Sequence, residues 1–221
     1  MPVYDLEEQE QIDELKTWWK QYGNLVSTAV TVAAVLAVGW QGWTWWQRDQ
    51  ARQAAEVYAT VERAAMGHDA RVAREATGEL IDKFSGTSYA GLAALLSAKL
   101  QFDAGDLKNA RLQLTWVADH GKDAEIRDLA RLRLAAVMQD EKSYDEALAQ
   151  LAAAPVASLA ARYAELRGDI LLAQGKSAEG VAAYAAAIAK LDELEKSAGE
   201  QRRQAYRQVL QVKLESQGGR P

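Results

Sequence analysis

Few side chains in this sequence are suited to catalysis or to metal binding. The chain has no cysteine, so disulfides, thiolate catalysis and cysteine-type zinc or iron–sulfur sites are excluded. Its two histidines are His68, in a Gly-His-Asp turn, and His120, next to Gly121 near an expected helix end. We interpret both as surface structural residues, His120 being favoured there by the helix dipole. We therefore expect no metal site.

Acidic pairs and basic clusters do not change this interpretation. The pairs at 140–141 and 145–146 adjoin solvated turns, which does not favour paired-carboxylate catalysis. No GxGxxG, GxxxxGK[ST], HExxH or GxSxG motif is present. The arginines at 131 and 133 and at 202, 203 and 207 have no interleaved aromatic residues, and the net charge is −5. The sequence predicts a protein that is not an enzyme, with no catalytic residue, no cofactor and no nucleic-acid partner.

The uncharged stretch between Lys20 and Arg48 predicts a transmembrane helix over residues 24–47. Its apolar part, 25–46, would span about 33 Å as a helix, close to the thickness of a hydrocarbon core. A core helix of a soluble protein and a cleaved signal peptide are the alternatives. Aromatic side chains, which favour the membrane interface, flank both ends: Trp18, Trp19 and Tyr22 before the span, and Trp40, Trp43, Trp45 and Trp46 at its end.

Two further features concern the membrane. Ala29, Ala33 and Ala37 recur at every fourth residue, so they could form a packing face for another helix, although alanine is common throughout the chain. The segment 1–23 is acidic and amphipathic. Lysine and arginine are almost equally frequent on the two sides of the span, so these charges do not determine the orientation.

After residue 48 the apolar periodicity is helical and repetitive. Expected helices cover 3–22, 24–66, 69–84, 88–104, 107–120, 123–139, 143–153, 156–174, 177–193 and 198–216. Three segments align through pairs of small residues, spaced first by 37 and then by 33 residues: Ala98 with Ala110, Ala135 with Ala147, and Gly168 with Gly180. Gly105, Lys142 and Gly175 occupy equivalent turns.

This pattern resembles the tetratricopeptide repeat, a helical hairpin with small residues where its two helices cross. We expect an all-α chain: a single transmembrane helix, then a divergent tetratricopeptide-like α-solenoid over 48–216 with a C-terminal capping helix, and a tail at 217–221. An irregular helical bundle is the alternative.

The first helices of a tetratricopeptide-like array line its concave side and would form a peptide or partner groove. The residues expected to line this groove are Leu92, Lys99, Phe102, Gln139, Arg162, Glu165, Asp169 and Leu172. Leu92, Phe102 and Leu172 could equally be inter-helix core.

The acidic start, the WWKQYG sequence at 18–23, the span ending in tryptophans and the short repeat array together resemble the YfgM-type family. This resemblance implies a single-pass protein of the bacterial inner membrane, with a cytoplasmic N-terminus and a periplasmic repeat domain. It also implies association with the SecYEG translocon and a PpiD-type periplasmic chaperone. The implied role is that of a chaperone or adaptor for unfolded envelope proteins. A repeat scaffold of another envelope assembly or division complex is the alternative.

Overall fold

The computed structural model describes residues 6–195 and 200–219, and within them it contains helices and no strand. The predictions for residues 1–5, for the start of the capping helix at 198–199 and for the last two residues of the tail lie outside this range. The helices are α1 (Leu6–Met66), α2 (Ala70–Phe84), α3 (Ser88–Asp103), α4 (Leu107–His120), α5 (Ala124–Asp140), α6 (Tyr144–Gln150), a 3₁₀ turn (Ala157–Leu159), α7 (Ala160–Ala173), α8 (Ser177–Glu195) and α9 (Glu200–Ser216).

The chain divides into two units, Met1–Gln50 and Ala51–Pro221. The first unit is the N-terminal part of α1. Among the described residues, α1 is the one helix long and apolar enough to cross a membrane, with a mean hydropathy of 1.6 over its best window. Valine, leucine and tryptophan side chains of the expected span are exposed in the chain by itself, Trp40 to 71%. Such a surface favours an apolar environment over water.

A helix break between residues 22 and 24 was expected and is wrong, because α1 continues through Gly23. The indole of Trp19 packs against this glycine, with its Nε1 3.1 Å from the position that a Cβ would take. Gly23 therefore leaves room for the ring. A single glycine within a helix costs only about 1 kcal/mol, which a long helix tolerates.

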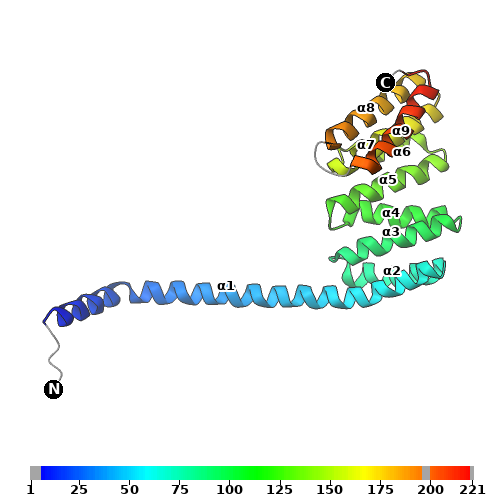
Figure 1. The fold of residues 1–221 in the computed structure, drawn as a ribbon. Helices are drawn as coiled ribbons and strands as arrows, with labels where there is room; N and C mark the ends of the chain where they lie inside the picture. Colours follow the sequence, from blue (N-terminus) through cyan, green and yellow to red (C-terminus); the bar gives the residue numbers. More distant parts are fainter. Residues whose placement is uncertain (1–5, 196–199, 220–221) are drawn as a thin grey trace. The chain divides into compact units, whose positions relative to one another are not determined.

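The second unit is a stack of helical hairpins, as Figure 1 shows for α2 to α9. Residues 51–66 of α1 pair with α2, and Ala54, Val61 and Ala64 of this segment are buried in a core shared with α2 and α3. A second core joins α3 to α7, and a third joins α7, α8 and α9. Each hairpin thus buries its apolar face against its neighbours, as in other repeat proteins.

The aligned small residues lie at the crossings within the hairpins. Ala98, Ala110, Ala135 and Ala147 are at most 1% exposed, and Gly168 lies against Gly180 and Tyr184. A weaker copy of the repeat, centred on Ala73, is also present in the sequence, and the structure forms it as the first hairpin of the array. Its equivalent positions, Val61 and Ala73, are 37 residues before the next pair and are fully buried.

The turns within the hairpins repeat the same backbone geometry. The residues with positive φ among these four turns are His68 (54°), Gly105 (79°), Lys142 (62°) and Gly175 (77°), with the same spacings of 37, 37 and 33 residues. In each turn the following amide donates to a carbonyl five residues earlier, for example Asp106 N to Gln101 O at 2.8 Å. This is the Schellman arrangement that ends a helix in the left-handed conformation. His68 is therefore a turn residue.

The third hairpin has a shorter second helix than expected. The helix expected over 143–153 ends at Gln150, and α7 begins only after the 3₁₀ turn, whereas 156–174 was expected to be one helix. Pro155 cannot donate a backbone hydrogen bond. The connection is held instead by Asp128, a buried residue of α5, whose Oδ2 accepts from Val156 N at 2.8 Å and whose carbonyl accepts from Tyr163 Oη at 2.8 Å.

Candidate functional site

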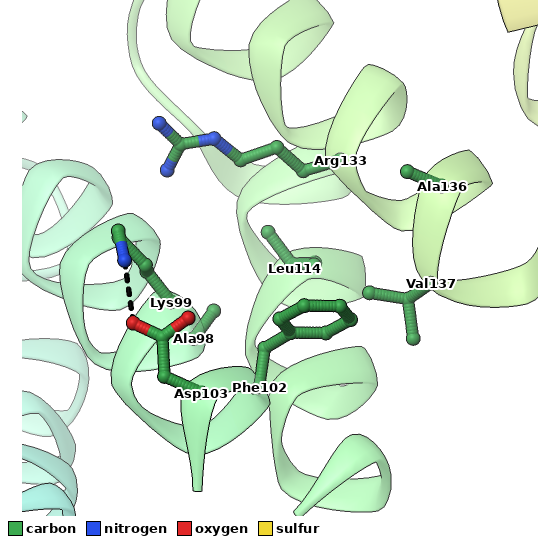
Figure 2. A pocket seen from close by; sticks show the side chains of 8 residues that line it. All are labelled: Ala98, Lys99, Phe102, Asp103, Leu114, Arg133, Ala136 and Val137. Carbon is green, nitrogen blue, oxygen red and sulfur yellow. Dashed lines mark hydrogen bonds and ion pairs between the residues drawn. The ribbon is translucent and has the colours of Figure 1, made fainter. Parts of the chain in front are cut away.

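The first helices of the second and third hairpins form a pocket with an apolar wall. It has a volume of about 310 Å³ between α3 and α5. Figure 2 shows the ring of Phe102 beside Leu114 and Val137, with Lys99 and Asp103 paired on α3. Phe102 is 39% exposed, so its ring is accessible from solvent. The complete lining is Ala98, Lys99, Phe102, Asp103, Leu114, Arg133, Ala136 and Val137.

A second, more polar pocket of about 390 Å³ continues from the first along α5, α7 and α9. The two pockets share Arg133 and Ala136, so they adjoin each other. We call their combined lining the groove. The lining of the second pocket is Leu132, Arg133, Ala136, Arg162, Glu165, Leu166, Asp169 and Tyr206.

Three residues of the second pocket, Glu165, Asp169 and Tyr206, belong to an ionic network between α7, α8 and α9. Lys213 Nζ of α9 lies 2.8 Å from Glu165 Oε1 and 2.9 Å from both carboxylate oxygens of Asp169. Tyr206 Oη donates to Glu165 Oε2, and Tyr184 Oη donates to Asp169 Oδ1, each at 2.5 Å. The two carboxylates of α7 are thus satisfied by the capping helix and by α8.

These contacts shift the ionisation of the network. Burial, followed by the hydrogen bonds to Asp169 and Glu165, raises the pKa of Tyr184 and Tyr206 above the ordinary value, so both remain neutral donors. Burial opposes the charge of Lys213, but the hydrogen bonds and charges of the two carboxylates outweigh it and raise its pKa. These pKa shifts favour neutral tyrosines and a charged Lys213, the forms that donate the hydrogen bonds of the network.

Arg133 lies where the two pockets meet and crosses from α5 to α3. Its Nη1 donates to the Leu95 carbonyl of α3 at 3.3 Å. Partial burial lowers the pKa of this guanidinium, and the positive charge of Arg162 lowers it further. The groove thus holds two arginines that repel each other, one from α5 and one from α7.

The structure brings five of the eight proposed groove residues into the groove. Lys99 and Phe102 line the first pocket, and Arg162, Glu165 and Asp169 line the second. Leu92, Gln139 and Leu172 line neither pocket. Leu92 is exposed on α3, and Gln139 is near the end of α5. Leu172 packs into the α7–α8 crossing, where its Cγ lies 2.7 Å from the position of a Cβ on Gly180.

Residues of two kinds in and beside the groove are not predicted from the sequence. Leu132 and Ala136 stand 33 residues before Glu165 and Asp169, so the repeat alignment itself could have identified them. Tyr206 lines the second pocket and Lys213 belongs to the ionic network beside it; both come from the capping helix, which aligns with no repeat, and no sequence signal connected them to α7.

The proposed membrane residues lie in the first unit. Ala29, Ala33 and Ala37 are exposed on α1. Among the flanking aromatics, the rings of Trp18 and Tyr22 are 5.8 Å apart and those of Trp43 and Trp46 are 5.3 Å apart.

In the described part of the chain, no three His, Asp or Glu residues form a group that could hold a metal ion.

Comparison with known proteins identifies the family. The family described as a tetratricopeptide repeat-like domain matches residues 16–219. Three similar proteins are each named an ancillary SecYEG translocon subunit. The protein from Neisseria gonorrhoeae is 33% identical over 96% of this chain and 97% of its own length. The protein from Haemophilus influenzae is 30% identical over 78% of this chain and 84% of its own length. The protein from Escherichia coli is 27% identical over 85% of this chain and 90% of its own length. Because the similarity includes both the apolar helix and the repeat domain, the chain belongs to the YfgM-type family of ancillary SecYEG translocon subunits.

Proposed function

We propose that this protein is a membrane-anchored accessory subunit of the SecYEG translocon that binds unfolded envelope proteins and a PpiD-type chaperone on the periplasmic side. The names of its relatives support the association with SecYEG. The groove is the single observation that supports polypeptide binding. It runs over three successive first helices and combines an apolar wall with charged side chains, which suits a flexible peptide segment.

Site-specific photocrosslinking tests this proposal. A photoreactive residue in place of Phe102 faces the groove, whereas one in place of Leu112, which is 59% exposed on α4, does not line it. We expect secreted polypeptides to be crosslinked from position 102 during translocation and much less from position 112. Equal crosslinking from both positions would contradict binding in the groove. Recovery of another envelope complex without SecYEG would favour the scaffold alternative.

The periplasmic location of the repeat domain is tested by topology reporters. A phosphatase that is active only outside the cytoplasm, fused after Leu214, should be active. A reporter that is active only in the cytoplasm should be inactive at the same site. The opposite pair of results would place the repeat domain in the cytoplasm and would exclude contact with polypeptides that emerge on the periplasmic side.

We also propose that α1 contacts a membrane partner through Ala29, Ala33 and Ala37. A leucine at position 33 would hold two helix backbones apart without opposing membrane insertion. Ala33→Leu should therefore reduce, but not abolish, co-purification with SecYEG or the chaperone. Val32→Leu is the control, because residue 32 points about 100° away around the helix. Undiminished co-purification of Ala33→Leu would leave α1 as an anchor only.

A further inference from the structure

Two positive charges in the groove have no acidic partner among the residues that the structure describes. Within the described residues, no carboxylate pairs with Arg133 or Arg162. The one hydrogen bond of the Arg133 guanidinium goes to a backbone carbonyl. Both arginines line the second pocket, and the charge of each is unfavourable for the other. Arginines held together in this way favour an anion between or beside them.

The acids of the groove do not supply that anion. Asp103 pairs with Lys99 on the same helix at 2.5 Å. Glu165 and Asp169 share Lys213 and receive the hydroxyls of Tyr206 and Tyr184. Each carboxylate that lines the groove is therefore committed to a neighbour other than the two arginines.

An apolar pocket adjoins the same arginines. Arg133 is part of the wall that also contains Phe102, Leu114 and Val137. Figure 2 shows its side chain extended over the pocket toward α3, leaving the ring of Phe102 at the opposite side. A ligand that placed an anionic group at Arg133 would have an apolar surface directly beside it.

We propose that the groove selects peptide segments in which a carboxylate lies next to a large apolar side chain. The carboxylate binds between Arg133 and Arg162, and the apolar side chain packs against Phe102. This inference rests on the proposed peptide-binding function and adds the class of segment that is bound. Arginine is suited to it because the planar guanidinium can donate two parallel hydrogen bonds to one carboxylate.

Short fluorescent peptides test this specificity on the full-length protein in mild detergent. One blocked peptide contains Phe-Glu, a second contains Phe-Gln at the same place, and a third ends in a free carboxylate after Phe. The Phe-Glu peptide should bind about tenfold more tightly than the Phe-Gln peptide, as expected for charge-assisted hydrogen bonds to two arginines. The third peptide shows whether a terminal carboxylate can replace the side chain.

Variants assign the preference to its residues. Arg133→Gln and Arg162→Gln should each reduce the preference for Phe-Glu while leaving Phe-Gln binding almost unchanged. Phe102→Ala should weaken all three peptides. Arg167→Gln is the matched control, because Arg167 is, like Arg162, an exposed arginine of α7, but it lines neither pocket. Circular dichroism of each variant checks that the helices remain folded.

The possible outcomes separate this inference from the proposed function. Equal binding of the Phe-Glu and Phe-Gln peptides, both weakened by Phe102→Ala, would overturn the carboxylate preference and leave peptide binding intact. A preference that persists in the Arg133→Gln, Arg162→Gln double variant would also overturn it. Absence of binding by all three peptides would overturn both the inference and the proposed groove.

Discussion

At the scale of single residues, the absence of a side chain sets the distance between the helices of a hairpin. At Gly168 an added Cβ would lie 2.7 Å from two ring carbons of Tyr184 and 3.1 Å from the Gly180 carbonyl oxygen. The ring cannot easily move aside, because its hydroxyl is bound to Asp169. The sequence repeat therefore reflects a steric requirement at this crossing.

Gly168→Ala should lower the free energy of unfolding by about 1–3 kcal/mol, because α7 and α8 must separate to admit the methyl group. Thermal melting followed by circular dichroism measures this. Gly78→Ala in α2 is the control, since nothing lies within 4 Å of its added Cβ. That change should increase stability by about 0.5–1 kcal/mol through helix propensity. Equal melting of the two variants would show that the α7–α8 crossing is not closely packed.

Lys142→Gly should stabilise the repeat domain by about 0.5–1 kcal/mol, because Lys142 has a φ of 62° in a turn where Gly105 and Gly175 stand at the equivalent positions. The comparison is with Lys122→Gly, in the loop before α5, where φ is not positive. That variant should gain nothing and should lose a little through the greater entropy of the unfolded chain. A loss of stability in Lys142→Gly would mean that its side chain contributes more than its backbone conformation costs.

At the scale of elements, α9 is attached to the array by polar contacts as well as by its core residues. Leu210 and Leu214 are buried, while Lys213 joins Glu165 and Asp169 at distances of 2.8–2.9 Å. Loss of the ammonium group would leave two partly buried carboxylates without the cation that they share. The attachment of the capping helix α9 to α7 should therefore depend on the positive charge of Lys213.

Lys213→Met should lower the free energy of unfolding by about 1–3 kcal/mol near pH 8. The carboxylate oxygens of Glu165 and Asp169 that accept from Lys213 Nζ would then lose this donor. The folded-state pKa of Lys213 is raised. Its stabilising contribution is therefore present below the unfolded-state value of about 10.4 and is lost as the pH rises through the folded-state value. The stability difference between wild type and variant should thus narrow under alkaline conditions, as melts at several pH values would show.

Lys190→Met is the control for this pair of measurements. Lys190 forms an exposed ion pair with Glu193 on the same helix, and such pairs contribute little. The melting temperature of Lys190→Met should equal that of the wild type at each pH. A difference between wild type and Lys213→Met that stays constant into the alkaline range would show that packing, rather than charge, holds α9 in place.

At the scale of the whole molecule, the two units have different environments. The N-terminal part of α1 exposes apolar side chains, whereas the second unit has its own buried cores. Residues 51–66 of α1 belong to the second unit, where Ala54, Val61 and Ala64 are buried. The continuous helix thus contributes to both units.

A fragment of residues 51–221 should fold as a soluble helical domain with a cooperative thermal transition, because its cores are complete without the membrane segment. Circular dichroism in buffer without detergent tests this. A fragment of residues 67–221, which lacks the first helix of the first hairpin, should melt at a lower temperature. Equal stability of the two fragments would contradict a structural role for the end of α1.

The sequence by itself determined the features that depend on local pattern. The apolar length and flanking tryptophans identified the candidate span, and small residues at fixed spacings gave the register of the hairpins. These signals are readable because helix periodicity and close crossings act on residues near one another in the chain. The repeat signal of the first hairpin is weaker and centres on Ala73, because Val61 stands where the next hairpin has the small residue Ala98.

Only the tertiary structure decided which of these residues form the groove. Leu172 aligns with groove positions, yet its side chain fills the space above Gly180. In the sequence Arg133 is one of two closely spaced arginines of α5, but its guanidinium donates to a carbonyl of α3 and meets the charge of Arg162. Lys213 lies 48 residues from Glu165 in sequence and 2.8 Å from it in space. Which charges are neutralised and which remain available depends on how the helices cross, and residue types and spacing alone do not specify that.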